Sequence, residues 1–156
     1  KEIIGYGHSI GGGVQGDALN THKLKQGIKY CFVKSRTFSD LSTTAADLTG
    51  SGILGYLVRF FGWNISSIDS SKKLQAPEII IQTARVHEYT DIAGEPEKIT
   101  HDGIISSEAS LARKLLDDGE PLLGNKYYMG IPETHNHPFR DPSHLVEKIN
   151  AMLETA

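Results

Sequence analysis

The glycine-rich turn near the start of the chain constrains the fold most. An apolar pair, Ile3-Ile4, leads into the segment Gly-His-Ser-Ile-Gly at residues 7–11, and further small residues follow. This order predicts a strand that turns sharply into a helix, with Ser9 in a strained backbone conformation at the turn. We expect Gly7 and Gly11 to be required because side chains there would collide with the neighbouring strand and helix. A serine presented in this way is typical of a nucleophile that needs a base and an oxyanion donor.

The segment from Ile3 to Gly13 resembles the nucleophile elbow of the α/β-hydrolase superfamily, in the form that is common in lipases and esterases. The resemblance implies that Ser9 is the nucleophile and that the backbone amide of Ile10 supplies half of the oxyanion hole. A dinucleotide-binding fingerprint is less consistent, because Ile10 stands where its third glycine belongs. A plain glycine-rich turn is the other alternative.

Periodic apolar segments after this turn predict alternating helices and strands. We expect helices within residues 13–27, 41–48, 66–73, 108–116 and 145–153, and strands at residues 28–33, 78–82 and 126–131. Together with the strand before Ser9, these elements predict an α/β fold with about four mostly parallel strands flanked by helices. For the helix after Ser9, we expect Ile10, Val14, Ala18 and Leu19 to form a modest apolar stripe. We expect Gly11, Gly12 and Gly13 to allow a close approach to the sheet.

The resemblance implies a three-layer, partial α/β-hydrolase fold. In that superfamily the elbow follows the fifth strand, whereas here it lies close to the first residue, so the chain resembles a carboxy-terminal half. We expect residues 1–156 to form one domain, with residues 42–75 inserted as a helical cap or lid. An apolar patch at residues 53–63 could cover a substrate channel, meet a membrane surface, or pack on the core.

The loop after the last predicted strand contains the second informative motif, which begins at His135 and runs through His137 to Asp141-Pro142. Its position between a strand and a final amphipathic helix resembles the histidine loop of the same superfamily. The resemblance implies that His135 is the catalytic base and His137 a bystander, although a shift of two residues would exchange their roles.

The acid of the expected triad is harder to place. The superfamily delivers an aspartate just past the strand that corresponds to residues 78–82, but Thr83-Ala-Arg-Val86 follows here. We therefore expect Asp91 to orient His135, with Glu88 and Asp102 as alternatives. The chain order of serine, acid and histidine agrees with that of α/β-hydrolases.

The same loop leaves a metal-dependent hydrolase as a third possibility, because Glu133, His135, His137 and Asp141 are possible zinc ligands. Its His-x-His-Pro segment resembles a JAMM-type metalloprotease loop, but the downstream Ser-x-x-Asp of that family is missing. We accordingly expect no metal and no cofactor.

The charge and composition of the chain narrow the class of protein to which it can belong. Its net charge of −3 and pI near 6.2, without a basic run, argue against nucleic-acid binding. The single Cys31 lies in an apolar run, which predicts a buried thiol. Neither a signal peptide nor a membrane-spanning run is recognisable. The longer match resembles hydrolase-like proteins of intracellular bacterial pathogens, which implies a cytoplasmic protein or an exported effector.

We expect this domain to cleave an ester or a lipid-like acyl substrate through an acyl-enzyme. The alternative is a catalytically inactive domain of the same fold that binds a partner. The strand at residues 2–6 would lie at an unpaired sheet edge, and we expect this edge to meet an amino-terminal half of the fold or a second copy of the chain.

Overall fold

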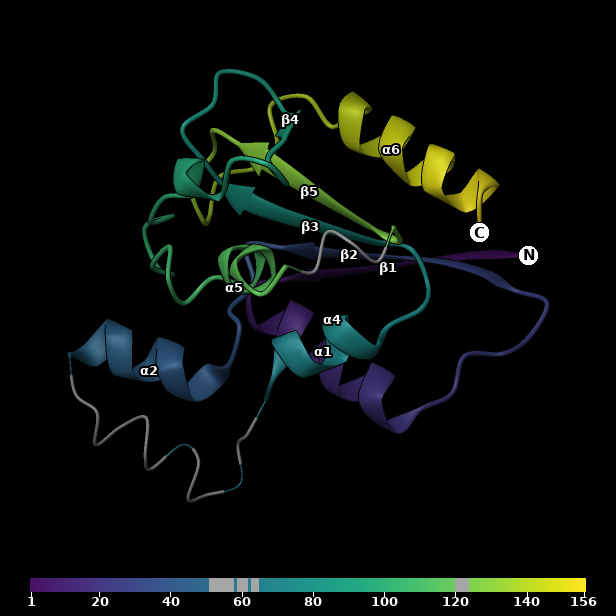
Figure 1. Ribbon diagram of the computed structural model, residues 1–156, viewed down its shortest axis with the longest axis horizontal. Helices are drawn as coiled ribbons and strands as arrows, with labels where there is room; N and C mark the ends of the chain where they lie inside the picture. The colour runs from purple at the N-terminus through teal and green to yellow at the C-terminus, as the bar shows by residue number, and fades with distance from the viewer. Residues whose placement is uncertain (51–57, 59–61, 63–64, 120–123) are drawn as a thin grey trace.

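A five-stranded sheet forms the centre of the computed structural model, which describes residues 1–50, 58, 62, 65–119 and 124–156 (Figure 1). The strand order is β1-β2-β3-β5-β4, and all pairs are parallel except the pair of β4 with β5. The strands are β1 (Glu2–His8), β2 (Lys29–Ser35), β3 (Glu78–Thr83), β4 (Thr90–Asp91) and β5 (Lys126–Ile131). The predicted α/β class and the four parallel strands are confirmed, and the short antiparallel β4 adds a fifth.

Helices cover both faces of this sheet, which gives the three layers that the resemblance implied (Figure 1). Helix α6 lies on one face, and α1, α4 and α5 lie on the other. The helices are α1 (Ile10–Thr21), α2 (Leu41–Thr49), α4 (Ser67–Lys73), α5 (Leu111–Asp117) and α6 (Ser143–Glu154), with a 3-10 turn η1 (Pro96–Lys98).

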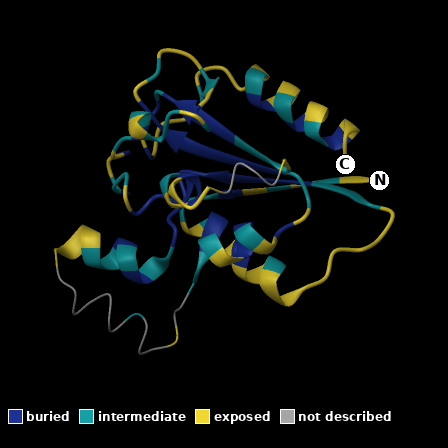
Figure 2. Cartoon of the chain, in the orientation of Figure 1, coloured by how far each residue is buried: buried dark blue, intermediate teal, exposed yellow. Residues whose placement is uncertain are grey.

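Strand β3 shows how an unbroken apolar run produces this layering. All six of its residues are buried, because helices cover the sheet on both sides of it (Figure 2). Ile79 and Ile81 belong to the apolar cluster that contains the inner face of α6, whereas Ile80 belongs to the cluster of α5. Cys31 of β2 is also buried, as predicted, and burial together with the nearby Glu78 raises its pKa to about 11.

Helix α1 contacts the protein through glycines rather than through the predicted apolar stripe. Gly12, Gly13 and Gly16 are its buried residues, whereas Ile10 and Val14 are 56% and 55% exposed. A Cβ atom at Gly13 would lie 2.8 Å from side-chain carbons of both Ile65 and Phe38. The helix therefore packs too closely for any side chain on its inner face, and the prediction of a core-facing stripe was wrong.

A buried ion pair fastens α4 to the sheet. The Lys34 Nζ atom of β2 lies 2.8 Å from Glu78 Oε1 of β3, and both side chains are fully buried. Lys34 also donates hydrogen bonds to the hydroxyls of Ser70 and Ser71 in α4. Helix α4 thus belongs to the helical layer on the sheet.

The predicted cap at residues 42–75 includes both α2 and this packed α4. The apolar patch at residues 53–63 falls almost entirely outside the described residues, so its role as a lid stays a prediction. Within the described parts of the chain, no helix has the length and apolar character required to cross a membrane.

Candidate active site

Ser9 stands at the turn between β1 and α1 in a conformation that residues with side chains rarely adopt. Its φ and ψ angles are 54° and −123°, outside the regions that are open to most residues. The Ser9 amide donates a hydrogen bond to the Ser35 carbonyl oxygen at 3.0 Å, which fixes the turn to the end of β2. Ser9 occupies the N-cap position of α1, but its hydroxyl does not cap the helix. The strained serine turn is as predicted, and its hydroxyl is not used to begin the helix.

The glycines around Ser9 differ in how strictly they are required. A Cβ atom on Gly7 would lie 2.7 Å from both the Cα and the amide nitrogen of Gly12, so the expected requirement at this position is confirmed. A Cβ atom on Gly11 would have no described atom within 4 Å, and the expectation of a collision there was wrong. Gly12 is the crowded position instead, because a side chain there would overlap Thr37.

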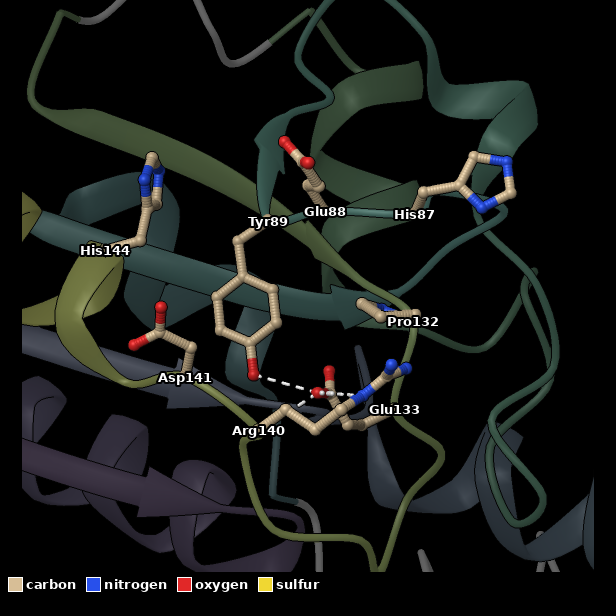
Figure 3. A pocket seen from close by; sticks show the side chains of 8 residues that line it. All are labelled: His87, Glu88, Tyr89, Pro132, Glu133, Arg140, Asp141 and His144. Carbon is tan, nitrogen blue, oxygen red and sulfur yellow. Dashed lines mark hydrogen bonds and ion pairs between the residues drawn. The ribbon is translucent and has the colours of Figure 1, made fainter.

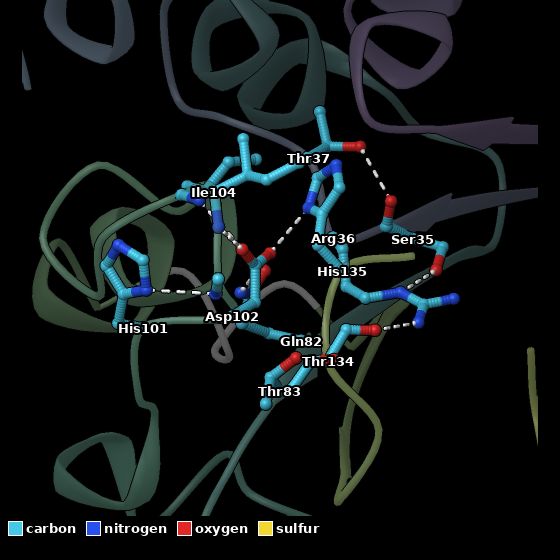
Figure 4. A network of polar contacts seen from close by, with 12 residues as sticks. Ser35, Arg36, Thr37, Gln82, Thr83, His101, Asp102, Ile104, Thr134 and His135 are labelled. Carbon is cyan, nitrogen blue, oxygen red and sulfur yellow. Dashed lines mark hydrogen bonds and ion pairs between the residues drawn. The ribbon is translucent and has the colours of Figure 1, made fainter. Parts of the chain in front are cut away.

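A buried histidine and aspartate form the centre of the site (Figure 4). The His135 Nδ1 atom lies 2.8 Å from Asp102 Oδ2, and His135 is only 3% exposed while Asp102 is fully buried. The backbone amide of His135 also donates to the Asp102 carbonyl oxygen at 2.7 Å. The carboxylate therefore favours the tautomer with a proton on Nδ1, which leaves Nε2 as the basic nitrogen.

The Asp102 carboxylate is itself held by several donors (Figure 4). Its Oδ1 atom accepts hydrogen bonds from the backbone amides of Ile104 and Ile105 at 2.9 and 2.7 Å. The Gln82 side chain, from the end of β3, donates to Oδ2 at 3.4 Å. These donors fix the direction of the carboxylate, as an orienting acid requires.

The structure does not bring Asp91, the acid first expected, to His135. Asp91 lies in β4, where it pairs with Met129 in the middle of β5, whereas His135 lies beyond the end of β5. Its exposed carboxylate accepts a hydrogen bond from the Ala93 amide at 2.8 Å. The antiparallel return through β4 carries Asp91 to the outer edge of the sheet, and Asp102, one of the two alternatives, takes the position on His135.

Glu88, the other alternative, is exposed and lines a cavity of about 330 Å³ between the loop before β4 and the start of α6 (Figure 3). The buried side chain in this cavity is Glu133, whose Oε1 accepts hydrogen bonds from the Tyr89 hydroxyl and the Arg140 amide, both at 3.0 Å. Burial opposes ionisation of Glu133, but these hydrogen bonds and the Arg140 charge outweigh it and lower its pKa. Figure 3 shows the Glu88 and His87 side chains pointing away from Glu133, so neither of them joins this buried carboxylate.

His8 was not singled out by the sequence, yet it connects the serine turn to the histidine. Its ring centroid lies 4.9 Å from that of His135, and His8 immediately precedes Ser9. Burial lowers the pKa of His8, and the nearby positive charge of Arg36 lowers it further. His8 therefore keeps a neutral ring beside the proposed base.

The four candidate zinc ligands are engaged elsewhere. His135 contacts Asp102, Glu133 contacts Tyr89, and the exposed His137 holds the Thr134 hydroxyl at 2.6 Å. Asp141 accepts hydrogen bonds from Ser143 at the start of α6. Among the residues that the structure describes, no group of three or more histidine, cysteine, aspartate or glutamate side chains could hold a metal ion.

The α/β fold of this chain has counterparts among solved structures. It is similar to the Pyrococcus furiosus esterase Pf2001 in two crystal forms, with TM-scores of 0.59 and 0.60 at 16% and 15% identity. Each match covers 99% of this chain and 53% of the esterase, so the chain spans about half the length of that protein. Residues 1–154 match the family described as Chlamydia CHLPS protein (DUF818), and the chain belongs to this family. No curated protein matches the sequence.

Proposed function

We propose that this chain is a serine-hydrolase-like domain that cleaves an ester or a lipid-like acyl substrate. The observation that carries the proposal is the buried contact of 2.8 Å between His135 and Asp102, beside the strained turn that holds Ser9. The resemblance of residues 3–13 to a nucleophile elbow supports Ser9 as the nucleophile. The fold shared with an esterase supports the general class of reaction.

In this reaction the Ser9 Oγ atom attacks the acyl carbon while His135 Nε2 takes the hydroxyl proton. The Ile10 amide, at the first position of α1, is one of the donors that a helix leaves without an intrahelical partner, and it stabilises the oxyanion. The bond to the leaving alkoxide then breaks, and the alkoxide takes the proton from His135. Water attacks the acyl-enzyme with the same assistance from His135, which releases the acid and returns the proton to Ser9.

A fluorophosphonate probe tests this proposal because it forms a covalent bond only with an activated serine. We expect the wild-type protein to be labelled on Ser9, as identified by mass spectrometry of the labelled peptide. Ser9→Ala and His135→Asn should both abolish labelling, because they remove the nucleophile and its base.

Ser107→Ala is the matched control, since the Ser107 hydroxyl contacts Glu108 on the surface and has no part in the proposed reaction. Labelling that persists in Ser9→Ala would contradict the assignment of the nucleophile. A folded wild-type protein that resists the probe would favour the alternative, a binding domain of this fold without activity.

We also propose that the open edge of β1 meets further polypeptide that extends the sheet. β1 lies at one edge of the sheet, and its Ile4 and Tyr6 side chains are 52% and 51% exposed. Ile10 and Val14 expose a second apolar stripe on α1, which packs on β1. An exposed strand edge with apolar side chains favours pairing with another strand. The half of the esterase that this chain does not match is the kind of partner that these surfaces fit.

Analytical ultracentrifugation of this chain alone tests the second proposal. Without its partner the bare edge should self-associate as the concentration rises, and the double variant Ile4→Lys/Tyr6→Lys should sediment as a monomer. The exposed Val146→Lys on α6 is the control and should leave the association unchanged. A wild-type chain that stays monomeric at every concentration would argue against an apolar interface at β1.

A further inference from the structure

The proposed nucleophile and base come from strands that are not neighbours. β2 and β3 lie between β1 and β5. Because neighbouring strands are about 4.8 Å apart, β1 and β5 are separated by roughly 14 Å in the sheet. The His135 ring is nevertheless only 4.9 Å from the ring of His8. The loop after β5 must therefore cross the carboxyl ends of β3 and β2, and some contact has to hold it there.

Arg36, the residue directly after β2, makes that contact (Figure 4). Its Nη1 atom donates hydrogen bonds to the carbonyl oxygens of Thr134 and His137, at 2.6 and 2.7 Å. Arg36 therefore binds the loop on both sides of His135. The guanidinium carbon also lies 5.1 Å from the centroid of the Phe139 ring, which belongs to the same loop. Arg36 is only 3% exposed, so its side chain is buried among these contacts.

The backbone of Arg36 is as constrained as its side chain. Its φ angle is 48°, in the left-handed region that favours glycine, and its amide donates to the Ile81 carbonyl oxygen of β3 at 2.7 Å. A buried arginine held in a strained conformation implies that its side-chain direction is needed there. Arg36 and Ser9 are the described residues other than glycine with a positive φ, and both border this site.

Ser35 completes the link to the nucleophile. Its carbonyl oxygen accepts the hydrogen bond from the Ser9 amide, and its hydroxyl accepts one from Arg36 Nε at 3.2 Å. Two successive residues at the end of β2 thus hold the serine turn on one side and the histidine loop on the other. We infer that Arg36 is a positioning residue that sets the placement of His135 relative to Ser9, an inference whose catalytic meaning rests on the proposed function.

An arginine suits this task better than a lysine. Its planar guanidinium presents donors in a fixed geometry and stacks on an aromatic ring, whereas an ammonium group is a compact charge on a flexible stem. Arg36→Lys should therefore keep the charge but lose the geometry. Arg36→Gly removes the side chain and suits the positive φ angle, so it separates the loss of the contact from backbone strain.

The first measurement does not depend on activity. We would follow the Nδ1 proton of His135 by NMR, because exchange with water reports how firmly the ring is held against Asp102. We expect its signal in the wild-type protein, and we expect it to broaden or disappear in Arg36→Gly and Arg36→Lys. Arg140→Gly is the matched control, since Arg140 lies on the same loop with a side chain that is 75% exposed, and it should keep the signal.

The second measurement is the rate of fluorophosphonate labelling. A displaced base should slow labelling of Arg36→Gly on the order of 100-fold, and added methylguanidinium should restore part of this loss. An unchanged His135 signal in folded Arg36→Gly would overturn the inference. If that variant does not fold, an unchanged signal in Arg36→Lys would do the same. A wild-type protein that is not labelled would contradict the proposed function alone, because the NMR result still decides the role of Arg36.

Discussion

The carboxylates of Asp102 and Glu78 are both fully buried, but different kinds of donor surround them. Asp102 receives two backbone amides and the ring of His135. Glu78 instead faces two cations, with Lys34 at 2.8 Å and Lys126 at 3.7 Å, and its Oε2 atom has no hydrogen bond from any described residue.

This difference shows that Asp102 orients the His135 side chain, whereas Glu78 helps to hold α4 against the sheet. Backbone amides are fixed in space, so a carboxylate that accepts them holds its own direction and that of the imidazole beside it. A lysine is a flexible point charge, so its pair with Glu78 neutralises charge and joins α4 to the sheet without aiming a side chain at a site. The two regions should therefore respond in opposite ways to loss of charge.

Asp102→Asn should have the largest effect, on reaction rate. The amide side chain no longer favours a proton on Nδ1 of His135, so we expect labelling of Ser9 to slow on the order of 10³- to 10⁴-fold. Circular dichroism should show that the fold is retained. A rate near that of the wild type would assign the acid to another residue.

Glu78→Gln should instead affect stability. It leaves Lys34 buried without its ion-pair partner, and we expect a loss of about 3–5 kcal/mol in the free energy of unfolding, measured in urea. The double variant Lys34→Met/Glu78→Leu removes both charges and should lose less. Labelling of Ser9 should stay unchanged while the variant is folded, and a parallel loss of labelling would show that the two regions are coupled.

His8→Asn should produce a smaller effect, which depends on pH. The pKa of His8 lies below its ordinary value of 6.5 in the folded protein, so below that pH the unfolded chain binds a proton that the folded chain does not. Stability from this residue is therefore lost as the pH falls. Urea unfolding at pH values on both sides of 6.5 should show a weaker decline in the variant than in the wild type, and an equal decline would contradict the role given to His8.

Asp91→Asn should have the smallest effect of all. The exposed Asp91 side chain contacts the nearby Ala93 amide and lies away from His135, so we expect a change within about 0.5 kcal/mol in stability. The labelling rate should stay within about two-fold of the wild type, because the variant leaves Asp102 in place. A strong loss of labelling would restore Asp91 as the acid.

The strands and the outer helices could be predicted because their apolar patterns are long and regular. The run at residues 78–82 and the spacing of Leu145, Ile149 and Leu153 correspond to a buried strand and to the inner face of α6. The glycine turn and the histidine loop were also recognisable, since their residue types are required at fixed positions. Sequence alone therefore predicted the α/β class and the two segments that form the candidate site.

The remaining features depend on contacts between distant segments. Between β3 and Asp102 the chain passes through β4, which pairs with β5 at the edge of the sheet. No local sequence pattern predicts that this path places Asp91 far from His135. The inner face of α1 was misjudged because apolar spacing favoured Ile10 and Val14, which are exposed, although the glycines after Ser9 correctly indicated a close approach. The sequence analysis did not single out Arg36, because its hydrogen bonds to the carbonyl oxygens of Thr134 and His137 form only in the folded loop.

The open space beside Gly11 offers a practical route to watching the site. Gly11→Cys would add a thiol two residues from Ser9 without a clash against any described atom, and the native Cys31 is buried with a pKa of about 11. A maleimide dye or a spin label should therefore attach to the new thiol selectively. Such a reporter would detect arrival of an acyl compound or of an adjoining polypeptide even in a protein that turns over no substrate.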